Sequence, residues 1–255
     1  MPHNIIKNTY DYCTENKLFL IFIMVFLFSC HYIIYFFDSI LIGPTIFSII
    51  MMGYGLQVTR DVIYGGSRLP KIMPKKLITL GLKGFFVFSV YTAIQGLLMW
   101  YCSTFLNFPE FELESLVFNY YQTLHLIRVH DPVSFTIFII SGLIILYITT
   151  FFMELSLARL ADGGRFFNSF NFVRIKRAID IIGWRSYAMG YTKIIISILV
   201  LSWLVAYHIP FTIIDSVIDA VLSFFIFVIE YIGIGSVYKV YVDNKPGNVK
   251  KIEVE

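Results

Sequence analysis

Long runs of apolar residues without charge constrain this chain more than any other feature of its sequence. The first run, 18–37, contains no Asp, Glu, Lys or Arg. A helix needs about 20 mostly apolar residues to cross the hydrocarbon core of a bilayer. Several further segments meet this requirement. We therefore expect about six membrane spans, at residues 18–37, 40–57, 77–105, 133–157, 189–209 and 211–235.

The composition excludes a soluble or a disordered chain. Hydrophobic residues make up 58% and charged residues 15% of the 255 residues, against about 45–50% and about 25% in soluble domains. Disorder is excluded because disordered chains are poor in aromatic residues, and this one has 26 Phe and 17 Tyr. We predict an all-α fold, a polytopic transmembrane helix bundle that forms a single integral membrane domain over 1–255, with a flexible polar tail at 242–255.

Polar segments between the spans predict where helices end and where short helices begin. The second span is expected to continue to about Tyr64 and to stop at Gly65-Gly66, a helix-ending signal. Two segments, 107–132 and 158–188, have apolar residues at helical spacing and favour amphipathic helices at the membrane surface. Their apolar positions are Leu116, Tyr120, Leu124 and Ile127 in the first segment, and Phe172, Ile175, Ile179 and Ile182 in the second.

The placement of basic residues predicts the orientation of the spans. Of the 20 Lys and Arg residues, only Arg128 lies outside the two ends of the chain and the segments 57–83 and 158–193. Six spans place all of these basic segments on one side. Because cytoplasmic segments are enriched in Lys and Arg, we expect a cell-membrane protein with both termini in the cytoplasm.

The first apolar run has a second interpretation, as a cleaved signal sequence. Leu27-Phe28-Ser29-Cys30 resembles a weak bacterial lipoprotein cleavage box. Phe28 is bulky for that position, and the apolar run continues to Phe37, so the retained helix is favoured.

Ionisable residues inside the spans are candidates for function, because they are costly in a bilayer. Glu154, Lys193 and Glu230 are expected at a similar depth, where they form either a structural ion pair or a substrate or proton site. Asp215 and Asp219 share one helix face because they are four residues apart. They suggest either a hydrated outer vestibule or an ion path.

No catalytic or cofactor motif accompanies these residues. His125 and His130 lack the spacing of a helical zinc motif, and the Gly53-Tyr54-Gly55 sequence lies in a span, where close helix packing explains it better than nucleotide binding. We expect no catalytic residues, no metal, no cofactor and no nucleic-acid partner.

The basic segments also contain large apolar side chains, a mixture typical of contact with anionic lipid headgroups or with a protein partner. The alternative is that their charge serves topology alone. The candidate contact residues are Arg60, Arg68, Arg159, Arg165, Arg174, Lys176 and Arg177.

Three stretches together resemble a known family. They are Gly53-Tyr54 with Arg60, Gly65-Gly66 and Leu69-Pro70; then Gly81-Leu82-Lys83; and Ala158-Arg159 to Ala161 with Gly163-Gly164, Phe166, Phe170 and Phe172. Their order is similar to that of domain-of-unknown-function family 4013, multi-pass membrane proteins frequent in methanogenic archaea. The sequence departs from the family pattern at Lys71–Pro74, where acidic residues or Trp often follow Leu-Pro, and at Leu80, where an acidic residue often precedes Gly-Leu-Lys. The resemblance implies a wholly helical integral membrane protein and implies no reaction.

These features favour a non-enzymatic membrane protein: a scaffold, a lipid-interacting protein or a subunit of a complex, with the lipid bilayer, a protein partner or a second copy as its partner. The alternative is a transporter or channel for a small solute or ion that uses Glu154, Lys193 and Glu230. A membrane-embedded enzyme acting on lipid is a third hypothesis, and it lacks a recognisable nucleophile or metal site.

Overall fold

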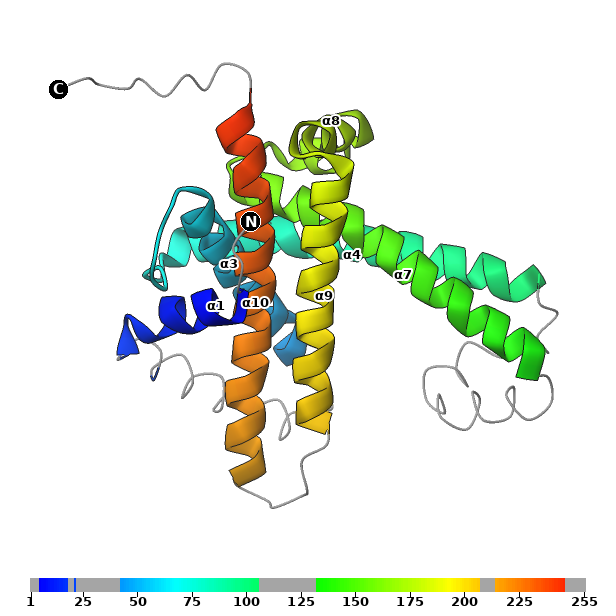
Figure 1. The fold of residues 1–255 in the computed structure, drawn as a ribbon, viewed down its shortest axis with the longest axis horizontal. Coiled ribbons are helices and arrows are strands. Elements are labelled where there is room, and N and C mark those ends of the chain that lie inside the picture. Colours follow the sequence, from blue (N-terminus) through cyan, green and yellow to red (C-terminus); the bar gives the residue numbers. More distant parts are fainter. Residues whose placement is uncertain (1–4, 18–20, 22–41, 106–131, 207–213, 246–255) are drawn as a thin grey trace. The chain divides into compact units, whose positions relative to one another are not determined.

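Helices account for all the regular structure in the described part of the chain (Figure 1). The computed structural model describes residues 5–17, 21, 42–105, 132–206 and 214–245. The predicted all-α fold is confirmed over these residues. The elements are α1 (Ile5–Thr14), α3 (Ile42–Ile63), α4 (Pro74–Phe105), α7 (Pro132–Ala161), the 3-10 helix η1 (Phe166–Phe170), α8 (Phe172–Ile182), α9 (Trp184–Ala206) and α10 (Ile214–Asn244).

Five of these helices are long and apolar enough to cross a membrane. Their mean hydropathy ranges from 1.2 over Thr45–Ile63 to 2.3 over Pro132–Ala161. The shortest has 19 residues, which at about 1.5 Å per residue nearly matches a hydrocarbon core of about 30 Å. Apart from residue 21, the first predicted span at 18–37 lies outside the described residues, so the count of six stays a prediction. The surface helix predicted within 107–132 also lies outside them.

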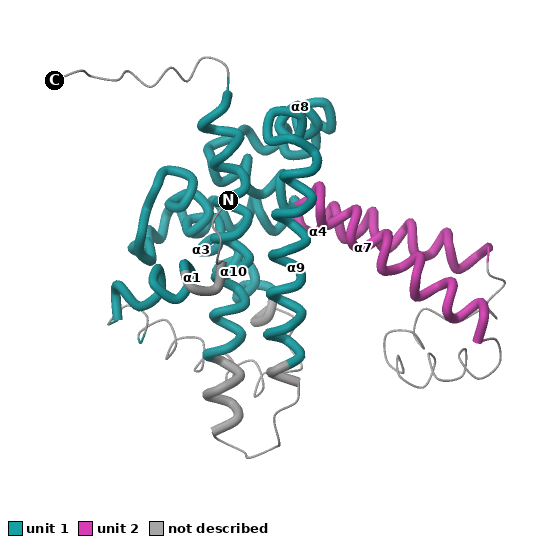
Figure 2. The backbone as a smooth tube through the Cα atoms, in the orientation of Figure 1, with its two compact units in different colours: residues 1–87, 154–255 teal, residues 88–153 magenta. Residues whose placement is uncertain are grey.

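The chain divides into two compact units (Figure 2). Unit 1 comprises residues 1–87 and 154–255, and unit 2 comprises residues 88–153. Unit 1 is built around α10, which packs against α1, α3, α8 and α9. Phe224, Val228 and Ile229 of α10 are almost completely buried. The core of unit 1 therefore lies along its last helix.

Unit 2 contains the second half of α4 and most of α7. Gly142 faces Met99, since a Cβ added at Gly142 would lie 2.9 Å from the terminal methyl of Met99. Leu97, Trp100 and Leu143 are each more than 60% exposed. Such faces suit lipid tails, which are as apolar as these side chains.

Within unit 1, α3 and α4 approach each other so closely that their backbones touch. A Cβ added at Gly53 would overlap the carbonyl oxygen of Leu77 and lie 3.1 Å from the Cα of Gly81. A Cβ added at Gly81 would overlap the carbonyl oxygen of Ile49. Two glycines on facing helices thus allow a contact that no larger residue permits.

Several helix ends differ from the expected boundaries. α9 begins at Trp184, before the predicted residue 189, because Gly183, with φ of 89°, ends α8 and nothing interrupts the helix afterwards. α10 continues past Gly235 to Asn244, so residues 242–244 of the predicted loose tail are helical. Gly235 does not end the helix because it serves packing instead: a Cβ there would lie 2.9 Å from the carbonyl oxygen of Thr59.

The amphipathic helix expected within 158–188 is α8. The side chain of Asn171 caps its start by accepting a hydrogen bond from the backbone N–H of Arg174 at 3.1 Å. Ile175, Ile179 and Ile182 are buried. Phe172, expected on the same buried stripe, is 56% exposed, because it stands at the first position of the helix, one turn before the buried residues.

Candidate functional site

The end of α3 brings the residues of the candidate site together. Gly65 has φ of 86°, a conformation that favours glycine. Its N–H donates to the carbonyl of Val62 at 3.1 Å, and the N–H of Gly66 donates to the carbonyl of Asp61 at 2.8 Å. This pair of bonds closes the helix as a Schellman motif. It fixes Arg60 and Asp61 in the last turn of α3, where the chain reverses.

The segment after this turn is held back against α3. Leu69 is only 2% exposed, and the hydroxyl of Tyr54 donates to the carbonyl of Pro70 at 3.5 Å. Tyr54, Leu69 and Pro70, which belong to the family-like motif, therefore together fix this segment against α3. They hold Lys71 and the start of α4 beside the end of α3.

A cavity of about 220 Å³ opens between these elements, and we call it the basic crevice. Its polar lining residues are Gln57, Arg60, Asp61, Tyr64, Lys71 and Lys76. Pro70, Met73 and Leu80 complete its lining with apolar surface. The crevice therefore combines three cationic groups and one carboxylate with an apolar side.

Gln57 is the most unusual member of the basic crevice. It is 7% exposed, and its side-chain nitrogen Nε2 has no hydrogen-bond partner among the described residues. A buried donor without a partner costs about 1–3 kcal/mol. Within the described residues, the crevice thus has a neutral donor whose hydrogen bond is unmade, next to three positive charges.

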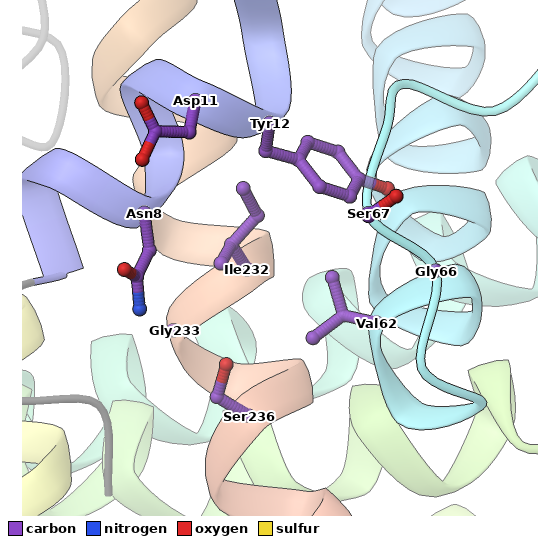
Figure 3. A pocket seen from close by; sticks show the side chains of 9 residues that line it. All are labelled: Asn8, Asp11, Tyr12, Val62, Gly66, Ser67, Ile232, Gly233 and Ser236. Carbon is purple, nitrogen blue, oxygen red and sulfur yellow. The ribbon is translucent and has the colours of Figure 1, made fainter. Parts of the chain in front are cut away.

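Asp61 of the basic crevice also binds α1, which lines a second cavity. The hydroxyl of Tyr12 in α1 donates to Oδ2 of Asp61 at 2.7 Å. Tyr12 also lines a cavity of about 280 Å³ between α1, the end of α3 and α10. Figure 3 shows the ring of Tyr12 reaching from α1 towards the turn at Gly66 and Ser67. The polar side chains around this second cavity are Asn8, Asp11, Ser67 and Ser236.

Burial of α1 affects its titratable groups. Burial raises the pKa of Tyr12, and the hydrogen bond to Asp61 raises it further, because that bond stabilises the neutral phenol. Burial also raises the pKa of the Cys13 thiol, to about 12. Both side chains are therefore neutral and protonated at physiological pH, so Tyr12 serves as the hydrogen-bond donor to Asp61.

A second helix end meets the same corner of unit 1. α7 closes like α3: the N–H of Gly164 donates to the carbonyl of Arg159 at 3.0 Å, and Gly163 has φ of 96°. Asp162, between α7 and Gly163, accepts the hydroxyl of Tyr64 at 2.8 Å and that of Tyr238 at 3.5 Å. Asp162 therefore joins the ends of α3 and α7 to α10.

Two neighbouring carboxyl groups lie inside unit 1. They belong to Glu154 of α7 and to Glu230 of α10, which is half-buried. Glu154 is 6% exposed, and its oxygen Oε2 has no hydrogen-bond partner among the described residues. Lys193, predicted to join them, is exposed on α9. The structure thus brings together two of the three predicted residues and leaves out the cation.

The remaining predicted residues are dispersed. Arg159 is half-buried, and its Nη1 donates to the carbonyl of Asn168 at 3.4 Å. Asp215 and Asp219 belong to the first turns of α10, and their side chains lie outside the described residues. His125 and His130 also lie outside them. The other predicted contact residues are exposed: Arg68, Arg165, Arg174, Lys176 and Arg177.

Five residues of the site were not predicted from the sequence: Gln57, Asp61, Lys71, Lys76 and Asp162. The two lysines belong to a basic segment from which only the arginines were singled out as contact residues. The double-glycine motifs after α3 and α7 are the signal that could have found Asp162, because residues beside such helix ends are held in fixed positions. In the described part of the chain, no three His, Cys, Asp or Glu side chains come together as a metal site would require.

These elements form an all-helical fold over the described residues, with five helices long and apolar enough to cross a membrane, as in a membrane protein, and with basic helix ends in unit 1. The family described as "Protein of unknown function (DUF4013)" matches residues 36–237, and the chain belongs to this family. The predicted resemblance is thereby confirmed. No curated protein and no solved structure matches the chain.

Proposed function

We propose that this protein is a non-enzymatic membrane protein that binds anionic lipid headgroups through the basic end of unit 1, and so organises lipid or anchors a complex in the cell membrane. The surface of η1 and α8 carries this proposal. Phe167 is 81% and Val173 is 71% exposed, and they stand next to exposed basic residues. An aromatic and aliphatic surface mixed with cations suits the headgroup region of a bilayer.

The energy scale supports the same proposal. Each basic residue near an anionic surface contributes about 1 kcal/mol. Arg165, Arg174, Lys176 and Arg177 together therefore contribute up to about 4 kcal/mol, a strong preference for anionic over neutral lipid. We propose that this end faces the cytoplasm, because nearly all the basic residues of the chain fall in segments on this side.

Trp184 offers a local measurement of lipid preference. Its ring nitrogen Nε1 donates to Oδ1 of Asp180 at 2.7 Å, which holds the ring beside α8. With Trp100 and Trp203 replaced by Phe, its fluorescence reports lipids around α8. We expect brominated phosphatidylglycerol to quench it more strongly than brominated phosphatidylcholine at equal mole fraction.

The test compares two triple variants with equal loss of charge. Replacing Arg174, Lys176 and Arg177 by Gln should abolish the preference for the anionic lipid. Replacing three exposed or half-buried lysines that belong to neither η1 nor α8 should leave it intact; these are Lys17, Lys239 and Lys245. Equal quenching by the two lipids in the parent protein would refute the proposal.

The buried carboxyl pair favours a second function, the transport of a proton or cation. Two neighbouring carboxyl groups repel each other when both are ionised, which favours a proton on one of them, and a proton held inside a membrane-spanning bundle is typical of proton relays. In proteoliposomes containing a pH-sensitive dye, Glu154→Gln and Glu230→Gln would each abolish proton flux, whereas Lys193→Gln would not. Absence of flux in the parent protein would exclude this function.

A further inference from the structure

The basic crevice has the parts that an anion site needs. Arg60, Lys71 and Lys76 supply positive charge, and Gln57 supplies a buried N–H donor that has no partner in the part of the chain that the structure describes. Exposed cations alone attract anions without selecting among them. A neutral donor behind the cations adds selectivity. Gln57 lines the cavity, and its Nε2, which solvent does not reach, gains a hydrogen bond if the side chain turns towards an acceptor seated there.

We propose that the basic crevice binds the phosphate group of a lipid headgroup or of a free phosphate. This inference deepens the proposed function and rests on it for the supply of lipid. Gln57 Nε2 donates to one phosphate oxygen, and the Arg60 guanidinium, whose fork of donors matches phosphate, binds the others. Lys71 and Lys76 balance the remaining charge.

The size of the crevice limits the ligand. Its volume of about 220 Å³ is smaller than the cavities of about 300–1,000 Å³ that enclose drug-sized ligands. A phosphate with a short substituent therefore fits better than a nucleotide. The apolar side formed by Pro70, Met73 and Leu80 lets an organic substituent lie against the wall.

Asp61 distinguishes between the two sources of phosphate. Its carboxylate lines the crevice and repels a bare phosphate ion on that side. A headgroup with a hydroxyl or ammonium group beyond the phosphate can donate a hydrogen bond to the same carboxylate. We therefore expect phosphatidylglycerol to bind more tightly than inorganic phosphate.

The experiment measures binding to the full-length protein in detergent by isothermal titration. The probes are short-chain phosphatidylglycerol, short-chain phosphatidylcholine and inorganic phosphate. Gln57→Leu is the informative variant, because it replaces the amide with an apolar group of similar size and removes the unsatisfied donor. We expect its unliganded stability to be equal to or higher than that of the parent protein. Its affinity for phosphatidylglycerol should fall about tenfold or more.

The control is Gln95→Leu, the same change at a half-buried position of α4 away from the crevice, which should bind like the parent protein. Binding of inorganic phosphate that Gln57→Leu abolishes would support the phosphate site and identify a free ion as its source. Unchanged binding by Gln57→Leu, or no binding of any probe by the parent protein, would overturn the inference. Trp184 quenching separates the two proposals. An anionic preference around α8 together with unchanged binding by Gln57→Leu would refute the crevice alone.

Discussion

Replacing Gly81 by Ala should separate α3 from α4, because no space exists for the added methyl group. The new Cβ would lie 3.1 Å from the carbonyl carbon of Ile49 and would overlap its oxygen, whereas ordinary contacts begin near 3.4 Å. Overpacking costs about 1–3 kcal/mol. The obstacle here is backbone, which cannot rotate away, so the upper end of that range applies.

Gly96 provides a matched control on the same helix. A Cβ added there meets nothing within 4 Å. Gly96→Ala should therefore stabilise the protein by about 1 kcal/mol through helix propensity alone. Gly81→Ala gains the same helix propensity but loses about 3 kcal/mol to the overlap with the backbone of Ile49. It should therefore be about 2 kcal/mol less stable than the parent protein. The two variants should differ by about 3 kcal/mol.

The assay is unfolding in mixed micelles with increasing dodecyl sulfate, followed by circular dichroism. The midpoint for Gly81→Ala should fall below that of the parent protein, and the midpoint for Gly96→Ala should rise slightly above it. Gly53→Ala should behave like Gly81→Ala, because the methyl group added on α3 would overlap the backbone of α4 at Leu77. Equal midpoints for Gly81→Ala and Gly96→Ala would refute the contact between α3 and α4.

Three further predictions concern the end of α3 and the helix docked beside it. A hydrogen bond to Asp162 raises the pKa of Tyr64, a residue just outside the candidate span Thr45–Ile63. This bond therefore stabilises the protein below a pH of about 10. The stabilisation is lost as the pH rises through the raised pKa. Tyr64→Phe should therefore reduce the fall in thermal stability between neutral and strongly alkaline pH, and an unchanged slope would contradict this. Burial raises the pKa of Cys13 to about 12, so maleimide at mildly alkaline pH should label Cys102 well before Cys13. Peptide mass spectrometry measures the two labelling rates. Equal rates would mean that α1 is not docked. Leu69→Ala should lower the free energy of unfolding by about 2–5 kcal/mol. Ile72→Ala, at a position 40% exposed, should lower it by less than about 0.5 kcal/mol. Similar unfolding midpoints for the two variants would contradict the anchoring role of Leu69.

Local signals in the sequence were enough to predict several features of the fold. The stop at Gly65-Gly66 was predictable because a positive φ and two backbone hydrogen bonds involve only neighbouring residues. The helical repeat of Ile175, Ile179 and Ile182 likewise predicted α8. In each case, the residues that decide the structure lie within one or two helical turns of one another.

Features that depend on distant residues were not predictable in the same way. Gly235 looked like a helix end, yet it faces Thr59 of α3, and a single sequence does not indicate which helix packs there. Lys193 had the right depth to join the two glutamates. The depth of a residue in the membrane does not determine which face of the helix it occupies, because successive residues are rotated by about 100° around the helix axis. Its neighbour Ile194 is 2% exposed, whereas Lys193 is exposed.

Gln57 illustrates the same limit at the candidate site. In the sequence it stands at the end of the predicted span 40–57, where a polar and basic segment begins. In the structure it belongs to α3, six residues before the helix ends at Ile63, on a buried face. A missing hydrogen-bond partner is a property of the whole surroundings of an atom, and no pattern of residue types reveals it.

The position of α10 has a consequence for how this protein is made. Every helix that packs on it within unit 1 precedes it in the sequence, so the ribosome finishes α1, α3, α8 and α9 while their common neighbour is still missing. Until α10 enters the membrane, Thr59 lacks its hydrogen bond to the carbonyl of Tyr231. Asp162 likewise lacks its hydrogen bond from the hydroxyl of Tyr238. Assembly of unit 1 therefore follows insertion of the last helix, and a chain released before that point would expose its unfinished faces to chaperones and membrane proteases.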